Sequence, residues 1–285
     1  MNWGSVKKIE VFGIRDAELS VRCRHFATYK NYHLDVAEYN LAVEEPLEIF
    51  IDGYPYRTAM RSPGDDINLV LGLCYTEGII DAWHDVRSLK DVQNVDGQPQ
   101  VLVELRRRGW QQRSWVSHEG PVKEKSEAVV SKGATGDFIC DKQKSPRGFT
   151  PIPIRDVFAY KQALEARQGL YSLTRCTHAC AIFDREGMML SLAEDVGRHN
   201  ALDKAVGVLV RAKRQRESYM MLISSRLSAE IVRKAARLGI EILGGMSAPT
   251  DKAVKMAHGL DLTLIGFLRD DSLTICTHPQ RVSIP

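Results

Sequence analysis

The chain has 285 residues, 44% hydrophobic and 26% charged, a composition typical of a globular protein with one large or two modest domains. Its net charge of +3 is too small to indicate a nucleic-acid partner. No run approaches the roughly 18 apolar residues that a membrane helix needs, and the start lacks the pattern of a signal peptide. We therefore expect a cytoplasmic protein with no membrane partner, in which the six scattered cysteines are reduced.

Residues 1–116 are predicted to form a smaller N-terminal α+β domain. Strands are expected over residues 6–12, 46–51, 54–60 and 101–105. The first is followed by a polar, poorly patterned stretch as far as Asn40. Asp52-Gly53 is a strong hairpin signal, because both residues tolerate the positive φ of a type I′ turn. Ser62-Pro63 then begins a helix over 65–77.

Residues 117–150 differ in composition, being rich in Ser, Gly, Lys and Glu, and are predicted to be a mobile linker between domains. Cys140 lies in this polar segment, next to Phe138 and Ile139. Nearby cations favour its thiolate, the form that acts as a nucleophile; they are Lys132, Lys142, Lys144 and Arg147. Two interpretations stay open: a group-carrying thiol, or an apolar anchor for the segment.

Residues 151–285 alternate between helical and extended patterns, which predicts an α/β domain with a mostly parallel sheet covered on both faces. Helices are expected over 154–168, 198–211, 228–238 and 251–258. Strands are expected over 171–183, 188–192, 219–223, 240–243 and 262–267, and a short one over 273–276 that contains Cys276.

Three strand-to-helix junctions of this half carry polar residues. They are Glu194–Asn200 (which includes Arg198 and His199), Ser224-Ser225-Arg226, and Gly244–Thr250. A parallel sheet places such junctions along one edge, where helix N-termini, hydroxyls and Arg226 or Arg269 would bind a phosphorylated ligand. Ordinary helix capping is the alternative. No Walker A loop and no Gly-x-Gly-x-x-Gly occurs, so a generic NTPase or dinucleotide dehydrogenase is unsupported.

The segment Cys176-Thr-His-Ala-Cys180 suggests a metal site, but its spacing argues against one. In a strand, the side chains of Cys176, His178 and Cys180 would share a face at intervals of about 6.6 Å. The two cysteines would then be too far apart for a single ion with bonds of roughly 2.0–2.3 Å. We predict no metal, and expect buried strand residues, with Cys176 or His178 in a pocket wall as the functional alternative.

A set of motifs resembles the FdhD family, over about residues 40–282. These motifs are Glu44-Glu45-Pro46-Leu47, Ser62-Pro63-Gly64-Asp65-Asp66, Thr76-Glu77-Gly78-Ile79-Ile80, Cys176-Thr-His-Ala179, Glu194-Asp-Val-Gly-Arg-His199 with Ala201-Leu-Asp-Lys204, Ser224-Ser-Arg226 and Thr277-His-Pro-Gln-Arg281. The resemblance implies an accessory protein that passes sulfur from a cysteine desulfurase, as a cysteine persulfide, to the molybdenum cofactor of formate dehydrogenase. It also implies a homodimer.

The resemblance further implies a three-layer C-terminal domain similar to cytidine deaminase, without that fold's zinc ligands, which counts against a deaminase-like hydrolase. The implied cargo is molybdenum bis(molybdopterin guanine dinucleotide), with GDP or GMP as a partial mimic. Cofactor contacts are expected from the three sites His178, Arg198-His199 and Ser224-Ser225-Arg226. By position, the nucleotide would contact Phe267, Leu268, Arg269, Asp270, Asp271 and Ser272.

The sequence departs from the family at its sulfur-carrying motif. The family usually has Cys-x-x-Cys after a Thr-Gly, whereas Thr135-Gly136 is followed here by Asp137-Phe-Ile-Cys140. A single thiolate can accept a persulfide, but it has no neighbour to resolve it by disulfide formation. Either Cys140 carries sulfur alone as a sulfurtransferase-like residue, or the protein is a cofactor-binding chaperone without sulfur transfer. Whether it is an enzyme stays open.

Overall fold

The computed structural model describes residues 20–30, 32–107, 110 and 151–284. The strand expected over 6–12, the linker 117–150 and Cys140 lie outside the described residues. The domain boundaries and the mobility of the linker therefore stay predictions. Within the described ranges, no helix is long and apolar enough to cross a membrane.

The N-terminal part contains a four-stranded sheet. Its strands are β3 (Glu45–Ile51), β4 (Tyr54–Arg61), β5 (Val86–Gln93) and β6 (Pro99–Leu105), in the order β4-β3-β6-β5. The predicted hairpin is confirmed, since Asp52 and Gly53 have φ values of 51° and 80°. Strand β5, which follows the short 3₁₀ helix η1 (Trp83–Asp85), was not expected. Most of its residues are exposed or half-buried, so it lacks a clear apolar alternation.

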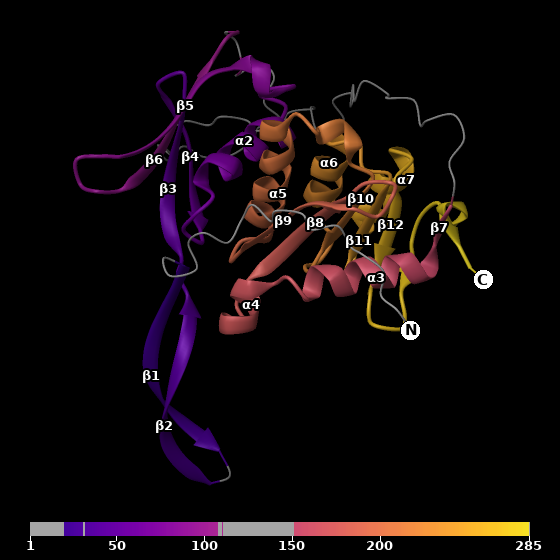
Figure 1. Cartoon of the computed structure of the whole chain (residues 1–285), viewed down its shortest axis with the longest axis horizontal. Coiled ribbons are helices and arrows are strands. Elements are labelled where there is room, and N and C mark those ends of the chain that lie inside the picture. Colours follow the sequence, from indigo (N-terminus) through magenta and orange to yellow (C-terminus); the bar gives the residue numbers. More distant parts are fainter. Residues whose placement is uncertain (1–19, 31, 108–109, 111–150, 285) are drawn as a thin grey trace, which may run out of the picture.

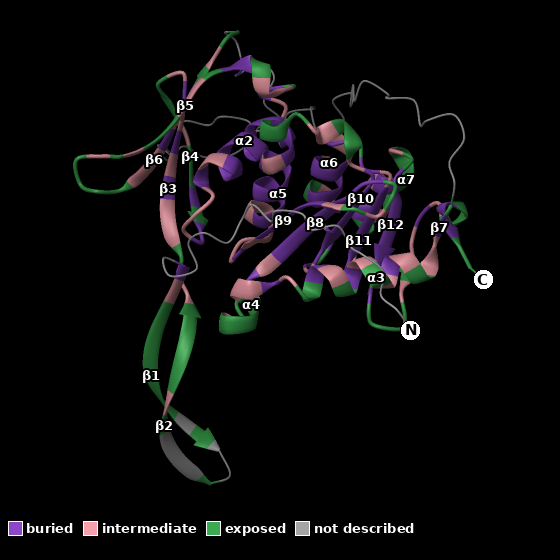
Figure 2. Cartoon of the chain, in the orientation of Figure 1, coloured by how far each residue is buried: buried purple, intermediate pink, exposed green. Residues whose placement is uncertain are grey.

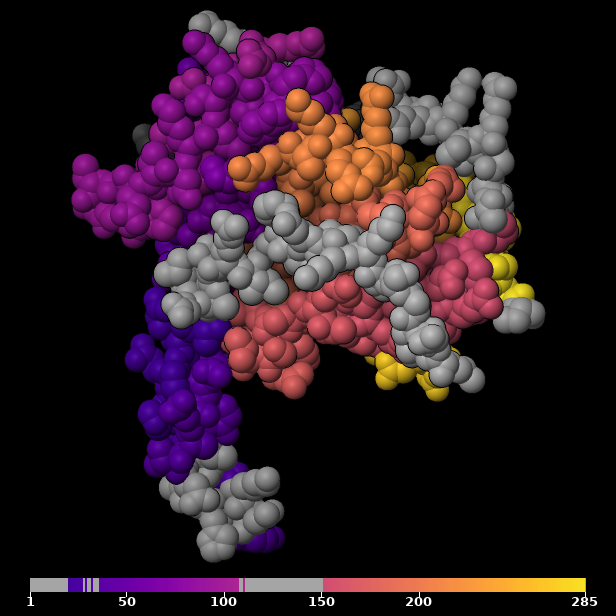
Figure 3. All heavy atoms as spheres, in the orientation of Figure 1, coloured from indigo at the N-terminus to yellow at the C-terminus, as the bar shows by residue number. Residues whose placement is uncertain are grey.

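The polar, poorly patterned stretch before Asn40 belongs to a long hairpin. Strands β1 (Val21–Lys30) and β2 (His33–Ala42) pair antiparallel along their whole length. The hairpin projects from the body of the protein (Figures 1 and 3) and most of its described side chains are exposed (Figure 2). The sequence analysis assigned no element to this stretch, because with neither face of the hairpin buried its alternation of apolar and polar residues is weak. Its exposed apolar residues include Phe26, Tyr29, Val36 and Tyr39.

The C-terminal part is built on a six-stranded sheet in the order β13-β12-β11-β10-β8-β9. These strands are β8 (His178–Phe183), β9 (Met189–Asp195), β10 (Met220–Ile223), β11 (Ile242–Gly245), β12 (Thr263–Gly266) and β13 (Thr274–Ile275). Strands β10, β11 and β12 are parallel, whereas β8 runs antiparallel to both its neighbours and β13 is antiparallel to β12. The sheet is thus mixed, with fewer parallel pairings than expected, because Asp184–Gly187 closes a tight β8–β9 hairpin instead of a crossover.

Helices cover both faces of this sheet, which confirms the predicted α/β class (Figure 1). Helix α3 (Ile154–Glu165) packs on one face, and α5 (Arg198–Ala212), α6 (Ala229–Arg237) and α7 (Asp251–Gly259) pack on the other. Four further short elements lie in this part: β7 (Ile152–Pro153), which pairs with β14 (Val282–Ser283), and the 3₁₀ helices η3 (Gln215–Glu217) and η4 (Pro279–Arg281). The likeness to cytidine deaminase stays a prediction.

One expected strand was partly wrong. Residues predicted as extended from Tyr171 form helix α4 (Gly169–Thr174) before β8 begins at His178. The carboxylate of Glu194 accepts the backbone N–H groups of Leu170 and Tyr171 at 2.8 and 2.7 Å. An anion at the start of a helix satisfies donors that have no partner within it, so a residue distant in sequence stabilises the turn.

Helix α2 (Asp66–Thr76) joins the two parts by packing against α5 (Figure 1). The two helices cross at glycines. A Cβ atom on Gly72 would lie 1.8 Å from the Asp203 carbonyl oxygen, and one on Gly207 would lie 1.8 Å from that of Asn68. Side chains larger than hydrogen are therefore excluded at both positions.

We predict that Gly72→Ala and Gly207→Ala each lower the free energy of unfolding by more than the about 1–3 kcal/mol typical of overpacking, because the obstructing atoms belong to backbone. Chemical denaturation measures this. Gly259→Ala is the matched control, since a Cβ there meets nothing within 4 Å. Equal stability of all three variants would contradict the proposed close crossing.

Candidate functional site

The carboxyl ends of β9, β10 and β11 lie at one edge of the C-terminal sheet, as predicted. This follows because β8 is antiparallel to both β9 and β10, while β10 and β11 are parallel. An open cavity of about 620 Å³ lies at this edge. It is lined by Glu165, Gln168, Tyr171, Ser172, Arg175, Cys176, Thr177, His178, Ser224 and Met246. Its volume falls within the range of small-molecule sites.

His178 and Ser224 form the strand side of the cavity. Ser224 Oγ accepts the backbone N–H of Ala179 at 2.9 Å and lies 3.3 Å from His178 Nδ1. Burial, together with the charges of Arg198 and Arg226, lowers the pKa of His178. The imidazole is therefore neutral at neutral pH, and the two arginines make the surroundings favourable to an anion.

Glu194, which the sequence placed at this edge, holds the wall of the cavity together. Besides the two N–H groups at the start of α4, its carboxylate accepts the Thr177 hydroxyl at 3.0 Å. All these donors flank the cavity on the α4 side. Glu194 is thus a positioning residue for α4.

Asp195 is fully buried and has a structural role. Its carboxylate lies 2.8 Å from Lys204 Nζ, and it accepts the backbone N–H groups of Gly197 and Ser62 at 2.8 and 3.1 Å. Lys204 also donates to the Ser62 carbonyl at 2.9 Å. These contacts join the junction after β9 to the segment before α2. Lys204 and Ser62 are 142 residues apart in sequence, so local pattern could not predict their contact.

Arg198 and His199 begin α5 beside this junction. The Nε atom of Arg198 is buried and has no hydrogen-bond partner among the described residues. His199 Nε2 lies 3.3 Å from Glu230 Oε2, but burial outweighs this carboxylate and lowers the pKa of His199 to about 4. His199 is therefore neutral near pH 7, and Arg198 is the charged residue of this pair; His199 Nε2, like Arg198 Nε, has no hydrogen-bond partner among the described residues.

The residues predicted to contact a nucleotide form a loop after β12. Arg269 donates to the carbonyl of Met246, which lines the cavity, and so the loop lies next to it. Phe267 is exposed and adopts a positive φ of 52°. The Leu268 side chain is buried in the core, which leaves only its backbone for a ligand. Asp270 pairs with Lys161 of α3 at 2.7 Å.

The remaining predicted residues differ in availability. Asp271, Ser272 and Arg226 are exposed. Ser225 is buried and its hydroxyl donates to the Arg226 carbonyl at 3.0 Å, so it supports the backbone of the loop. Sequence reasoning missed Gln168 and Arg175 of the cavity, because both flank α4, which was expected to be strand.

The described cysteines divide into buried and accessible ones. Cys74 and Cys180 are fully buried, Cys180 as predicted for a strand residue, and burial raises the pKa of both thiols. Cys176 is exposed in the cavity and precedes β8, so it does not share a strand with Cys180. Among the described residues, no group of His, Cys, Asp or Glu side chains is placed to hold a metal ion.

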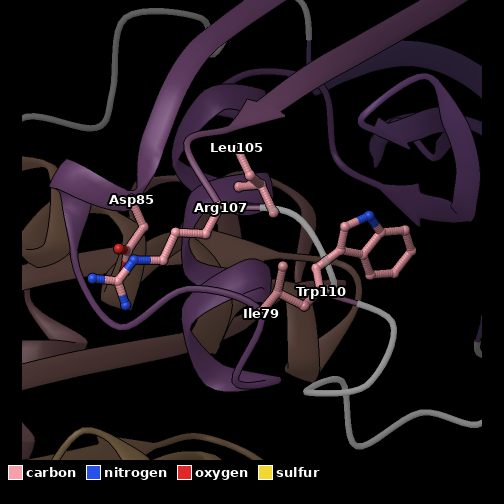
Figure 4. A pocket seen from close by; sticks show the side chains of 5 residues that line it. All are labelled: Ile79, Asp85, Leu105, Arg107 and Trp110. Carbon is pink, nitrogen blue, oxygen red and sulfur yellow. The ribbon is translucent and has the colours of Figure 1, made fainter.

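A second hollow lies in the N-terminal part, between Ile79, Leu105 and Trp110, with Asp85 and Arg107 beside it (Figure 4). Its volume is only about 10 Å³. That is at most enough for one water molecule, so this hollow offers no ligand site.

Comparisons with known proteins agree with the resemblance noted in the sequence. The model of the FdhD/NarQ family matches residues 42–283. The sulfur carrier protein FdhD of Saccharolobus solfataricus is 33% identical over 285 residues, covering 97% of this chain and 98% of the relative. The protein of the same name from Nocardia farcinica is 38% identical over 259 residues, covering 85% and 88%.

A solved structure supports the fold. The chain resembles the crystal structure of a protein described as a formate dehydrogenase accessory protein from Desulfotalea psychrophila, with a TM-score of 0.70. The match covers 92% of this chain and 99% of that one, at 19% identity. At this identity the likeness concerns the fold alone.

We predict that His199 makes the protein less stable as pH falls. Its folded pKa of about 4 lies below the ordinary 6.5, so the unfolded state binds the proton first. The stability it contributes is complete above about pH 6.5 and is lost towards pH 4, on the order of 1–2 kcal/mol by pH 5. Denaturation of His199→Gln and the native chain at pH 7.5 and 5 measures this.

The native chain should lose more stability than His199→Gln on acidification. His84→Gln is the control, since His84 is an exposed histidine in the N-terminal part. A difference between His199→Gln and the native chain that is the same at both pH values would show that the buried histidine does not titrate as described.

Proposed function

The chain belongs to the FdhD/NarQ family, and we propose that it is a sulfur carrier that serves as an accessory protein of formate dehydrogenase. In this proposal, Cys140 accepts sulfur from a cysteine desulfurase and passes it to the molybdenum cofactor. The names of its relatives and the cation-flanked cavity at the sheet edge support this function. A cysteine desulfurase, formate dehydrogenase and a second copy of the chain are the proposed partners.

The uptake step is a thiol exchange without net oxidation. The Cys140 thiolate attacks the terminal sulfur of the desulfurase persulfide, the sulfur–sulfur bond of the donor breaks, and the desulfurase cysteine leaves as a thiolate. A new sulfur–sulfur bond then joins Cys140 to the transferred atom. The lysines and the arginine that are near Cys140 in sequence favour the attacking thiolate.

Release of that sulfur as sulfide needs two electrons. A neighbouring cysteine could supply them by forming a disulfide with Cys140, but Asp137 occupies the position where the family usually has it. We therefore propose that an external thiol completes the transfer. The alternative function is a chaperone that presents the cofactor without transferring sulfur, and Asp137 is the observation in its favour.

The proposed cargo is molybdenum bis(molybdopterin guanine dinucleotide), whose phosphates carry negative charge. The edge of the sheet fits such a group, because Arg198 has a buried unsatisfied Nε atom and Arg226 is exposed beside His178. Arg269 lies at the other side of the same edge. Guanidinium groups bind phosphate oxygens in a fixed, bidentate geometry, which suits a nucleotide-bearing cargo.

We predict that GDP and GMP bind at this edge with an affinity that falls as salt rises, because phosphate capture is partly electrostatic. Arg226→Ala and Arg269→Ala should each weaken binding about tenfold, the loss typical of a charge-assisted contact, without lowering the melting temperature. Titration calorimetry measures the affinity. Arg216→Ala is the matched control, since this exposed arginine lies before β10, at the opposite edge. Unchanged affinity in both edge variants would place the site elsewhere.

We predict that a desulfurase supplied with cysteine places a persulfide on residue 140, that Cys140→Ser abolishes the persulfide at this position, and that Asp137→Cys increases it. The substitution of Asp137 removes a negative charge that disfavours the thiolate and adds a resolving thiol. Mass spectrometry of the peptide that contains residue 140, with and without reductant, quantifies the one-sulfur increase at this position. If neither the native chain nor Asp137→Cys gains sulfur while guanine nucleotides still bind, the chaperone function replaces the carrier function.

A further inference from the structure

The cavity at the sheet edge contains a cysteine that the proposed function does not use. Cys176 follows α4 directly, and its side chain is exposed within the cavity wall. Its backbone is held on the N-terminal side, where Arg175 adopts a positive φ of 55° and the Cys176 N–H donates to the Thr174 hydroxyl at 3.3 Å, and on the other side Thr177 donates its hydroxyl to Glu194 at 3.0 Å. The thiol is therefore held at a defined place in the wall.

A second residue of the cavity has a side-chain amide that is free to bind an occupant. Gln168 is only 7% exposed, yet no described residue hydrogen-bonds its side-chain amide. Its amide atoms are not among the fully buried polar atoms without a partner, so the amide reaches the open space of the cavity that Gln168 lines. A water molecule or an occupant of the cavity can therefore hydrogen-bond it there. A side-chain amide both donates and accepts, as a peptide group does.

The charges around the cavity favour an anionic occupant. Arg175 is exposed, stacks over Tyr171 with 5.3 Å between its guanidinium carbon and the ring centroid, and makes no ion pair within the described part of the chain. The one carboxylate in the lining, Glu165, is paired with Lys161 at 2.6 Å. The cavity thus presents a free cation, a peptide-like amide and a thiol.

We propose that this cavity binds cysteine persulfides carried on a peptide and that Cys176 takes up their terminal sulfur. The Cys176 thiolate attacks the terminal sulfur, the donor's sulfur–sulfur bond breaks, and the donor leaves as a thiolate, so that oxidation states are conserved. Gln168 binds the donor's peptide amide and Arg175 its carboxylate. This inference rests on the proposed sulfur-carrier function and adds a second sulfur-bearing residue to it.

Glutathione persulfide is a suitable probe, because it is a short peptide persulfide with carboxylates. We expect sulfur on Cys176 in the native chain and in Cys140→Ser, and none there in Cys176→Ser. Peptide mass spectrometry locates the sulfur, with fragment ions separating Cys176 from the neighbouring Cys180. Gln168→Leu should slow uptake about fivefold at low probe concentration, the loss of roughly one hydrogen bond, and saturating probe should restore the rate.

Two controls separate a binding site from simple exposure. Cys23 is exposed on the β1–β2 hairpin, and a hydrogen bond with Glu38 raises its pKa, so labelling is compared at pH 7.5 and pH 9. Methyl methanethiosulfonate, a small reagent that needs no amide contact, should modify Cys176 equally in the native chain and in Gln168→Leu. Uptake on Cys176 no faster than on Cys23 at both pH values would overturn the inference.

Different results would overturn the role of Cys176 and the sulfur-carrier function on which it rests. Sulfur found on Cys140 and never on Cys176, after incubation with either glutathione persulfide or a desulfurase, would overturn the role of Cys176 and leave the carrier function intact. Sulfur found on neither residue would overturn both. An equal effect of Gln168→Leu on persulfide uptake and on the small reagent would show that Gln168 merely supports the wall, and would overturn its proposed contact with the donor.

Discussion

The close crossing of α2 and α5 determines the position of nearly everything at the sheet edge. With glycine on each helix facing backbone on the other, the two axes approach closely enough that a single methyl group at either glycine would overlap a carbonyl oxygen. Helix α5 starts at Arg198, directly after β9. The crossing therefore fixes where Arg198 stands relative to the end of the sheet.

Buried ion pairs also hold the helices in this arrangement. Lys234 of α6 is fully buried 2.5 Å from Asp203 of α5, and Asp203 accepts the hydroxyl of Thr76 in α2 at 2.7 Å. Glu77, also fully buried, lies 3.1 Å from Arg57 of β4. Removing one member of such a pair leaves a buried charge alone, at a cost of about 3–5 kcal/mol. These ion pairs therefore hold β4 and α2 of the N-terminal part against α5 and α6 of the C-terminal part. The loops that lead into α5 and α6 at the sheet edge are thereby fixed at their helical ends.

Local patterns in the sequence predicted what local chemistry controls. The hairpin at Asp52-Gly53, the helices of the C-terminal part and the meeting of polar junctions at one edge follow from turn propensity and apolar periodicity. Helix α4 could not be predicted, because its first turn depends on Glu194, which is 23 and 24 residues away from its partners. The exposed β1–β2 hairpin could not be predicted either, because a ladder of backbone hydrogen bonds requires no apolar alternation in the sequence.

The same long-range contacts explain which polar residues are free to act. The sequence singled out Glu194 and Asp195 with the same emphasis as Arg198, yet the first two have their oxygens occupied by backbone and by Lys204, and so they build the site. At the sheet edge, two groups remain available to a ligand: the buried Nε atom of Arg198, which has no hydrogen-bond partner among the described residues, and the amide of Gln168, which lines the cavity. One can meet an anion and the other a peptide-like group. Sequence pattern identifies where polar residues gather, but only the hydrogen-bond partners distinguish the residues that hold the cavity from those that can bind its occupant.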